Sequence, residues 1–366
     1  MGRTTLVMLV ALAAVGLVGG QDAWGVQYVL TNLDTLPGYT DSMALGINAL
    51  GQVVGSAFRH LGSSQEYRPF LWDPKRGMID LGTPPGRPYG AAYDVNDHGQ
   101  VVGEVWGDGA RRGVLWDPVQ DIIDLGTLAG SAQGLNNLGE VVGQSSLEGA
   151  FFWSQSTGMT RPSTPGAVDR DAVDINDAGQ IAGTATFYDG QAYRARGFRL
   201  DRDGSFRYLH PLPGDTSSAV YGHLSSTGQI AGASSNPGGS LVAAVWNANT
   251  DVVRVGTLPG QLESLAFAVN DSGVVVGTSG RLNSGDSVAF VWQNGEMLDL
   301  NTAFLGGRGF TLRQARAVNN LGQIAGWRSD TDGTNWSAFL LTPIPEPSSL
   351  LALLCGLGGL VVVRRR

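Results

Sequence analysis

Apolar and polar residues alternate in short runs along most of this chain, and the alternation itself repeats. A nine-residue segment occurs seven times, with an apolar residue first, a polar residue second, a glycine fifth, and an apolar pair before a final glycine. The copies are residues 47–55, 95–103, 135–143, 175–183, 224–232, 269–277 and 318–326. The second residue falls at 48, 96, 136, 176, 225, 270 and 319, a mean period of about 45 residues. A period of this length indicates a repeat architecture.

Each nine-residue copy predicts a β-hairpin. An asparagine such as Asn96 can bond its own backbone two residues on, and Gly99 supplies the positive φ of a type I turn followed by a bulge. Apolar residues flank the turn, with Val95 before it and Val101 and Val102 after it. Two strands therefore meet at a tight reversal.

Two further strands complete each unit. The third ends at or near a tryptophan in residues 69–72, 113–116, 150–153, 244–246 and 289–292, with weaker copies at 197–200 and 338–341. The fourth follows a polar turn, in the Asp-Leu-Gly-Thr segments at 80–83 and 124–127 and in their relatives at 33–38, 255–260 and 299–302. Four short strands in about 45 residues are typical of a propeller blade.

Seven such units run without a linker from Tyr28 to Leu341. The sequence therefore predicts an all-β repeat protein, a seven-bladed β-propeller of four-stranded blades, as one domain over residues 26–342. The recurring tryptophans are expected in the core between blades. A β-solenoid or an open array of repeats is the alternative.

Both ends of the chain carry apolar segments of a different kind. Arg3 precedes an uncharged run from Leu6 to Val18, which predicts a helical secretory signal peptide over residues 1–25. Residues 343–349 are rich in proline and serine, and an apolar stretch from Leu350 to Val363 precedes a terminal arginine cluster. This end predicts a short transmembrane helix with the arginines on the cytoplasmic side.

The C-terminal 24 residues resemble the PEP-CTERM sorting signal of Gram-negative bacteria. The resemblance is carried by Pro345, Glu346 and Pro347, by the hydrophobic helix, and by Arg364, Arg365 and Arg366. It implies Sec export, signal peptidase processing, transient anchoring in the inner membrane and recognition by an exosortase. Release would then place the domain at the cell surface or in an extracellular exopolysaccharide matrix. An ordinary membrane anchor is the alternative.

The repeats resemble the extracellular HAF-repeat family, through the order Asp-Leu-Gly-Thr, the Ile-Asn-x-x-Gly-Gln-Val-Val-Gly hairpin and Ala-Phe-Leu-Trp over nearly all of residues 28–342. The histidine that precedes Ala-Phe in typical copies is replaced here by Gly149, Val288 or Ser337. Any role of that histidine is therefore not transferable. The resemblance implies surface exposure and names no activity.

Composition excludes several functions. The net charge is -8 and Lys75 is the only lysine, so no nucleic-acid partner is expected. The single cysteine, Cys355, lies in the predicted anchor, so the mature domain is expected to have no disulfide and no thiolate nucleophile. A hydrophobic share of 42% excludes a disordered chain.

Catalytic signatures are nearly absent from the sequence. It contains no Gly-x-Ser-x-Gly elbow, no His-Glu-x-x-His helix and no P-loop. The histidines His60, His98, His210 and His223 show no metal-ligand spacing and are interpreted as turn or loop residues. Oxygen-rich segments at 201–204 and 330–335 lack a complete calcium loop and are interpreted as hairpin turns. We therefore expect no cofactor, no metal and no enzyme activity.

The candidate binding residues lie in the variable loops after the second hairpin strand, on the face opposite the Asn-x-x-Gly turns. Arginines and aromatic side chains are concentrated there, as expected of loops that carry binding on a rigid scaffold. The candidates are Arg59, Tyr67, Arg111, Arg112, Tyr188, Tyr193, Arg194, Arg281, Trp327, Arg328 and Trp336. We expect a non-enzymatic surface module that binds exopolysaccharide or a surface protein. The alternatives are a polysaccharide-active propeller enzyme, which needs acidic side chains converging on the central channel, and a purely structural protein.

Overall fold

The computed structural model describes residues 26–344 except 63, 108, 127–129, 146–148, 164–165, 168, 189, 283–285 and 306–308. The predicted signal peptide, residues 1–25, lies outside the described residues, as do the Pro345–Pro347 triplet, the predicted transmembrane helix and Arg364–Arg366. Across the described part of 26–344, no helix has the length and apolar character needed to cross a membrane. Residues Gln27–Ile344 form one compact unit.

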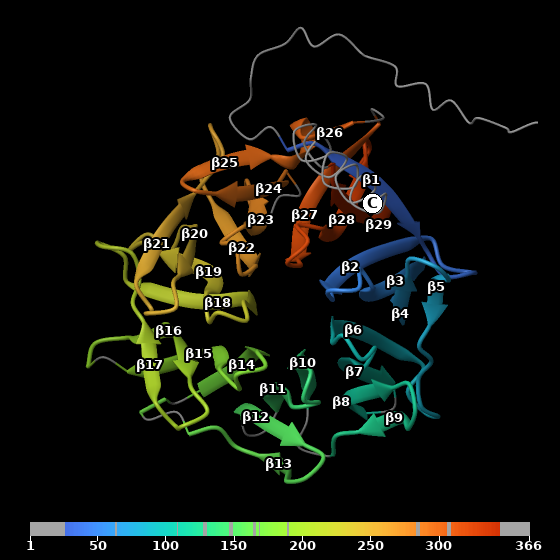
Figure 1. The fold of residues 1–366 in the computed structure, drawn as a ribbon, viewed down its shortest axis with the longest axis horizontal. Helices are drawn as coiled ribbons and strands as arrows, with labels where there is room; N and C mark the ends of the chain where they lie inside the picture. Colours follow the sequence, from blue (N-terminus) through green and yellow to red (C-terminus); the bar gives the residue numbers. More distant parts are fainter. Residues whose placement is uncertain are drawn as a thin grey trace, which may run out of the picture. The chain divides into compact units, whose positions relative to one another are not determined.

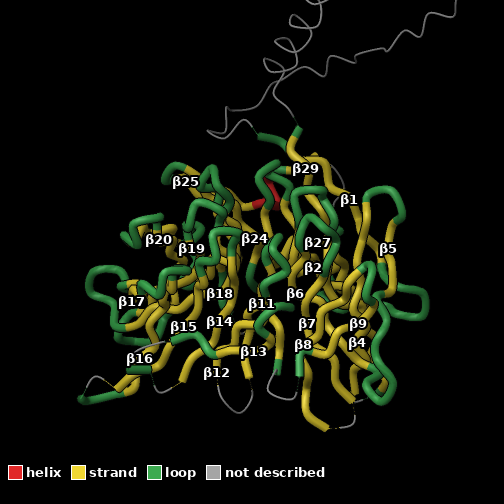
Figure 2. The backbone as a smooth tube through the Cα atoms, turned by 60° about the horizontal axis from the view of Figure 1, so that its bottom comes forward, coloured by secondary structure: helices red, strands yellow, loops and turns green. Residues whose placement is uncertain are grey.

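Short strands make up almost all of the regular structure of this unit, as the hydrophobic alternation predicted (Figure 2). The strands of the first half are β1 (Tyr28–Asp34), β2 (Asp41–Ile47), β3 (Val53–Leu61), β4 (Ser64–Asp73), β5 (Gly77–Asp80), β6 (Tyr89–Val95), β7 (Val101–Gly107), β8 (Gly109–Asp117), β9 (Asp121–Asp124), β10 (Ser131–Leu135), β11 (Val141–Ser145), β12 (Gly149–Ser154) and β13 (Gly158–Thr160).

The second half continues the same pattern with one short 3-10 helix, η1. Its elements are β14 (Asp169–Ile175), β15 (Ile181–Tyr188), β16 (Tyr193–Leu200), β17 (Phe206–Leu209), β18 (Ser217–Leu224), β19 (Ile230–Ser235), β20 (Leu241–Trp246), β21 (Val252–Gly256), β22 (Ser264–Val269), β23 (Val275–Ser279), β24 (Val288–Gln293), β25 (Glu296–Asp299), η1 (Leu300–Thr302), β26 (Phe304–Leu305), β27 (Phe310–Val318), β28 (Ile324–Asp330) and β29 (Trp336–Pro343).

These strands form antiparallel meanders that succeed one another around a central axis (Figure 1). Within the described residues, β2–β5, β6–β9, β10–β13 and β14–β17 are four-stranded sheets. Strands β18–β21 and β22–β25 form one eight-stranded sheet, whose halves are joined by a single parallel pairing of His223 with Ala268. In each meander the first strand lies nearest the axis and the last lies at the rim. The sequence repeat therefore corresponds to one radial sheet.

The N-terminal strand closes the ring. Strand β1 pairs antiparallel with β29, from Tyr28 opposite Pro343 to Asp34 opposite Ala338, in the sheet β26-β1-β29-β28-β27. Figure 1 shows β1, in blue, beside the last strand of the chain. The repeat and the sheet are thus offset by one strand, because β1 supplies the outer strand of the final sheet. The predicted fourth-strand segment at 33–38 overlaps β1 only at Leu33 and Asp34 and continues into a turn. This pairing joins the two ends of the unit by backbone hydrogen bonds.

The nine-residue segments form the predicted hairpin between the first and second strands of each sheet. In the turn between β2 and β3, the N–H of Gly51 donates to the carbonyl of Asn48 at 3.1 Å. The N–H of Leu50 donates to the side-chain Oδ1 of Asn48, also at 3.1 Å. Gly51 has a φ of 75°, which a residue with a side chain rarely adopts. The turn chemistry predicted from the sequence is therefore confirmed.

Glycine is required at the last position of each nine-residue segment for a different reason. A Cβ at Gly143 would overlap the carbonyl oxygen of Ser131 and the ring of Phe151, and all seven copies meet an equivalent carbonyl. The neighbouring first strand is bulged at this level, between Ala132 and Gly134 in β10. The bulge brings its backbone against the second strand, so only glycine fits there.

The core lies between neighbouring sheets. One cluster packs Val54 and Leu71 of β3 and β4 against Val95 and Trp116 of β6 and β8, and equivalent clusters recur around the ring. Trp246 is fully buried, and the tryptophans at 72, 116, 153 and 292 also belong to such clusters. The prediction that these tryptophans form the core between sheets is confirmed.

Candidate functional site

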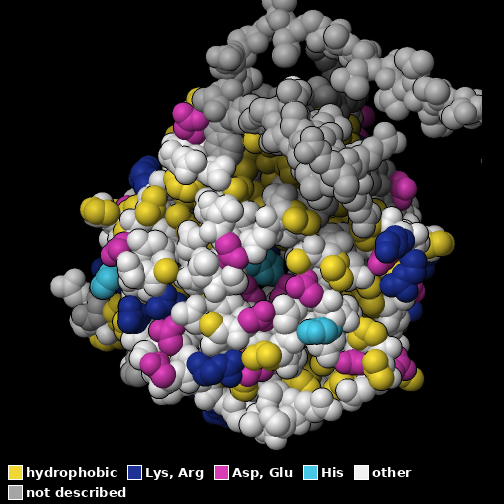
Figure 3. Space-filling view, viewed as in Figure 1, with side chains coloured by type: hydrophobic (Ala, Val, Ile, Leu, Met, Phe, Trp, Pro, Cys, Tyr) yellow, Lys and Arg dark blue, Asp and Glu magenta, His cyan; other side chains and the backbone are white. Residues whose placement is uncertain are grey.

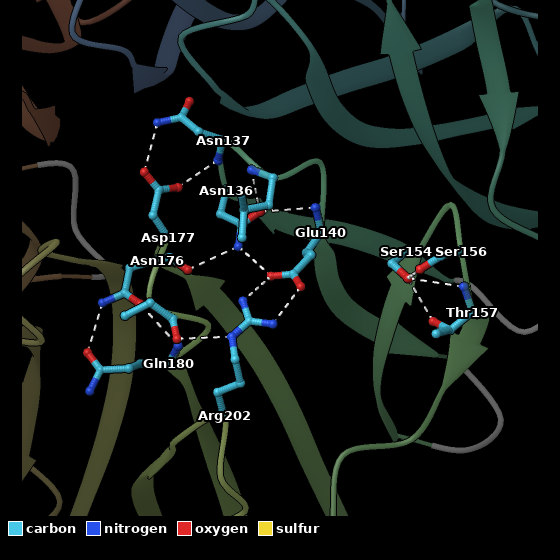
Figure 4. A network of polar contacts seen from close by, with 12 residues as sticks. Asn136, Asn137, Glu140, Ser154, Ser156, Thr157, Asn176, Asp177, Gln180 and Arg202 are labelled. Atoms are coloured by element: carbon cyan, nitrogen blue, oxygen red, sulfur yellow. Dashed lines mark hydrogen bonds and ion pairs between the residues drawn. The ribbon is translucent and has the colours of Figure 1, made fainter.

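A belt of asparagine side chains surrounds the central axis at the hairpin turns. The Nδ2 of Asn136 donates to the carbonyl of Asn176 in the next sheet at 3.0 Å and to Glu140 Oε2 at 2.7 Å (Figure 4). The same sheet-to-sheet bond is made by the asparagines at 48, 96, 176, 270 and 319, and Asn319 donates to the carbonyl of Asn48, which joins the last sheet to the first. The belt therefore links the turns around the axis.

A second set of bonds joins the third residues of neighbouring turns, at 49, 97, 137 and 271. The N–H of Asp97 donates to Asn137 Oδ1 at 2.8 Å. The N–H of Asn137 donates in turn to Asp177 Oδ1 at 2.7 Å (Figure 4). Ser225 replaces the belt asparagine in the fifth hairpin, and its hydroxyl accepts from the N–H of Gln229 at 3.0 Å. A serine hydroxyl is too short to reach the next turn, so the belt has one weak link.

The belt frames a cavity of about 220 Å³ on the axis. Figure 3 looks onto this face, with acidic side chains around a central hollow and a histidine below them. The carboxylates of Asp97, Asp177 and Asp271 lie at the turns, and Asp94 and Asp174 lie further along the first strands of their sheets. The charged side chains that line the cavity are therefore predominantly acidic.

Two carboxylates and an imidazole converge in this cavity. Each carboxylate follows the bulge of its strand, Asp94 in β6 and Asp174 in β14, and His223 comes from β18. The Nδ1 of His223 lies 3.4 Å from Asp174 Oδ2, and one donor atom from each of the three residues lies within 4.8 Å of the others. A bulge redirects the side chain next to it, which here points toward the axis.

The carboxylates also hold neighbouring sheets together. Asp94 accepts the N–H of Val95 and of Leu135 in the next sheet, at 2.8 and 2.9 Å. Asp174 accepts the N–H of Leu224 of the next sheet at 2.8 Å. Hydrogen bonds from backbone amides favour the charged form of a carboxylate.

Burial and an oppositely charged neighbour have opposite effects on the pKa values of His223 and Asp94. Burial raises the pKa of Asp94 to about 6, with His223 acting against the rise and Asp174 adding to it. Burial alone would lower the pKa of His223, but the charge and hydrogen bond of Asp174, together with the charge of Asp94, raise the pKa to about 9. His223 keeps 25% of its side chain accessible to the cavity, although protein surrounds it. At neutral pH the imidazole is therefore protonated.

Arg316 adds a second cation near this cluster. Its guanidinium lies 4.0 Å from the ring centre of Phe267, and its Nε is buried without a hydrogen bond. Burial lowers the pKa of Arg316 to about 10. The positive charge of Arg316 also opposes the protonation of His223.

Sequence reasoning missed this cluster. His223 was interpreted as a turn or loop residue, and that is wrong, because it lies in β18 and lines the axial cavity. The signal was its register: Asp94, Asp174 and His223 each precede the nine-residue segment directly, where the other four repeats have glycine or alanine.

A stripe of aromatic rings lies at the opposite end of the strands, where the variable loops begin. Successive ring centres are 4.6 Å apart from Trp327 to Trp336, 5.7 Å from Trp336 to Phe58, 5.5 Å from Phe58 to Tyr67, and 5.7 Å from Tyr67 to Trp106. We call these five residues the aromatic stripe. It crosses three sheets, so the fold brings together Tyr67, Trp327 and Trp336 from the candidate residues.

Arg111 lies at the end of the stripe, its guanidinium 4.8 Å from the ring centre of Trp106. It pairs with Glu104, whose side chain is almost fully buried and also accepts a 2.8 Å bond from the hydroxyl of Tyr93. Burial, followed by the charge of Glu104, raises the pKa of Tyr93. Tyr93, Glu104 and Arg111 line a pocket of about 470 Å³ together with Gln133 and other residues of the third sheet.

The other candidate residues are spread around the ring. Arg59 pairs with Glu66 at 2.6 Å beside the stripe, and Arg328 lies 4.3 Å from the ring centre of Phe310. Arg112 pairs with Asp124 at 3.5 Å. Three of the remaining four, Tyr188, Tyr193 and Arg194, lie in β15 and β16, and Arg281 follows β23.

Tyr188 and Tyr193 form a separate exposed pair, with ring centres 5.3 Å apart. The candidate binding residues therefore divide into one contiguous group and several isolated ones.

The interpretation of the oxygen-rich segments as turns agrees with the bonds of Asp330, which accepts from the N–H of Thr334 at 2.8 Å and from Asn335 Nδ2 at 2.6 Å.

Comparison with known proteins identifies the fold. No family model and no characterised protein sequence matches the chain. The propeller domain of the trilobed protease from Pyrococcus furiosus is similar in structure, at 10% identity and a TM-score of 0.52, over 84% of this chain and 94% of that one. This likeness, with the ring of antiparallel sheets, shows that the chain is an all-β protein of the β-propeller class.

Two other solved structures are similar at lower TM-scores. TolB from Acinetobacter baumannii aligns at 15% identity and a TM-score of 0.45 over 81% of this chain, which spans only 64% of TolB. The BP39L lectin from Burkholderia pseudomallei aligns at 12% identity and a TM-score of 0.45, over 82% of this chain and 98% of the lectin. These similarities concern the fold.

Proposed function

We propose that this protein is a seven-bladed propeller that binds a polymeric glycan at the aromatic stripe and catalyses no reaction. The observation that carries the proposal is the stripe itself. Its rings run contiguously over three sheets, and all but Phe58 are partly exposed. Such a surface suits an extended polymer.

The stripe combines the two kinds of contact that a sugar chain needs. Aromatic faces pack against the apolar C–H faces of pyranose rings, and partly exposed aromatics dominate binding energy in many interfaces. At its end, the exposed Arg111 offers hydrogen-bond donors beside the pocket of about 470 Å³, and the buried Glu104 holds it in place. Planar rings and directional polar groups together favour a neutral or anionic glycan.

The proposal includes export. The resemblance to HAF-repeat proteins and to the PEP-CTERM signal supports Sec-dependent secretion, signal peptidase cleavage, temporary anchoring through the C-terminal helix and processing by an exosortase. The protein would then act at the cell surface or in the exopolysaccharide matrix of a Gram-negative bacterium. Processing is tested by the size and location of the product in cells that carry or lack the exosortase.

Binding is tested with the full-length chain and exopolysaccharide from its own host, with bound protein and released sugar recorded together. Trp106→Ala and Tyr67→Ala are each expected to weaken binding about fivefold or more, corresponding to at least about 1 kcal/mol. Tyr193→Ala is the matched control, because it removes an exposed aromatic that is not part of the stripe. Equal binding by all three variants and the parent would refute the stripe as the glycan site.

A polysaccharide-active enzyme is the second candidate, favoured by the convergence of Asp94 and Asp174 on the axis. Release of oligosaccharide, abolished by Asp174→Asn, would establish it. A purely structural role would give neither binding nor release in the same assay.

A further inference from the structure

The axial cavity contains three side chains of the kinds that bind metal ions, contributed by three different repeats. A carboxylate oxygen of Asp94, a carboxylate oxygen of Asp174 and a ring nitrogen of His223 lie within 4.8 Å of one another. A point between them is within about 2.8 Å of all three, and metal–ligand distances of about 2.0–2.2 Å require only a small inward movement.

The position that carries these donors is small in every other repeat. The equivalent residues there are Gly46, Gly134, Ala268 and Ala317. Gly134 also makes room for the cluster, since a Cβ at that residue would lie 2.6 Å from Asp174 Oδ1. Burying two carboxylates side by side is costly unless positive charge compensates them.

We propose that Asp94, Asp174 and His223 bind one divalent transition-metal ion, such as Zn²⁺, in the axial cavity. Two carboxylate oxygens and one imidazole nitrogen form a mixed set, and the nitrogen favours Zn²⁺ over Ca²⁺ and Mg²⁺, which prefer oxygen alone. The ion takes the place of the proton that His223 carries at neutral pH, and that proton is released to solvent on binding. Three protein ligands leave a coordination position for water. This inference is independent of the glycan site at the other end of the strands.

The cavity also gives such an ion a route from solvent. His223 has a quarter of its side chain accessible to it, and the cavity volume of about 220 Å³ accommodates several water molecules. The carboxylates of Asp97, Asp177 and Asp271 line the same cavity at the turns, and a ring of one sign of charge raises the local concentration of cations.

The positive charge of Arg316, unlike the carboxylates, opposes the binding of a cation, so a variant of Arg316 serves as a control. Arg316 directly precedes Ala317, which lines the cavity, so its charge acts on the site without being a ligand, and the buried Nε makes no hydrogen bond. Replacing it with methionine keeps the contact with Phe267 and removes the charge. Arg316→Met is therefore expected to bind the metal several-fold more tightly.

The experiment measures Zn²⁺ binding to the metal-free full-length protein by isothermal titration calorimetry, with Ca²⁺ and Mg²⁺ titrated separately and Co²⁺ absorption reporting imidazole ligation. One Zn²⁺ per chain is expected, bound at least tenfold more weakly in His223→Ala and in Asp174→Asn. His98→Ala, an exposed histidine on a turn, should bind like the parent. Circular dichroism checks that each variant is folded.

Three results would overturn the proposal. They are the absence of stoichiometric Zn²⁺ binding, binding that survives His223→Ala in a folded protein, and binding that Arg316→Met leaves unchanged or weakens. If Asp174→Asn fails to fold, His223→Ala and Arg316→Met still decide the question, because neither side chain bonds to a backbone group in the hydrogen bonds found among the described residues.

Discussion

The asparagine belt predicts that a single side chain in a hairpin turn contributes several kilocalories per mole to stability. Asn136 is the clearest case. Its Nδ2 donates to the carbonyl of Asn176 and to Glu140, and its Oδ1 accepts the N–H groups of Leu138 and Glu140, both at 3.0 Å. Only 3% of the residue is exposed. Water therefore cannot replace these bonds when the side chain is removed.

The expected cost follows from counting these bonds. A buried hydrogen bond contributes about 1 kcal/mol net, and an abandoned buried partner costs about 1–3 kcal/mol. Asn136→Ala is therefore expected to lower the free energy of unfolding by about 3 kcal/mol. Asn136→Ser keeps an acceptor for the turn, as Ser225 does naturally, but loses the bond to the next sheet. It is expected to cost about 1–2 kcal/mol.

The measurement is urea denaturation followed by tryptophan fluorescence and circular dichroism. Coincident transitions with an unchanged slope allow the midpoints to be compared as free energies. Leu138→Ala is the matched control, since Leu138 lies in the same turn with 64% of the residue exposed, and it should change stability by less than about 0.5 kcal/mol. A loss below about 1 kcal/mol for Asn136→Ala would refute the assignment of the belt as a stabilising structure.

Three further predictions concern the same scaffold. Ser225→Asn should supply the missing bond to the carbonyl of Asn270 and raise the free energy of unfolding by about 1 kcal/mol in the same urea assay; a loss would show that the fifth turn cannot accept the amide. Hydrogen bonding to Arg202 lowers the pKa of Glu140, so its contribution is present above the ordinary carboxyl pKa and disappears as pH falls through the lowered value. Glu140→Gln should therefore be destabilised by up to about 1 kcal/mol at pH 7 and match the parent in acid, once the pH is below the lowered pKa of Glu140, whereas a difference that persists there would exclude the ion pair as its cause. Gly143→Ala should cost at least about 3 kcal/mol or prevent folding, because its Cβ overlaps a carbonyl of β10, and a native melting temperature would contradict that packing.

The class of fold could be predicted from the sequence because its determinants are local and repeated. Apolar alternation specified the strands, and the asparagine and glycine of each nine-residue segment specified a turn that the structure reproduces at Asn48 and Gly51. The regular position of the tryptophans identified the core, since a residue that recurs at one register in every repeat occupies equivalent surroundings. These signals need no knowledge of how distant segments pack.

Closure and the candidate sites depended on contacts between distant repeats. Strand β1 completes the last sheet because its backbone pairs with β29 at the other end of the unit. The aromatic stripe forms only because the first, second and last sheets are neighbours in the ring, which brings Tyr67 near Trp336. Tyr193 lies in β16 of the fourth sheet and is not part of the stripe.

The axial cluster shows most clearly that local sequence does not predict contacts between distant repeats. Asp94, Asp174 and His223 are 80 and 49 positions apart in the chain, and the residues next to each of them are uncharged. Their convergence arises because bulges turn these positions toward a common axis, and that axis exists only once the ring is closed. Local sequence thus determined what each repeat would build, and the tertiary structure decided which side chains from different repeats would meet.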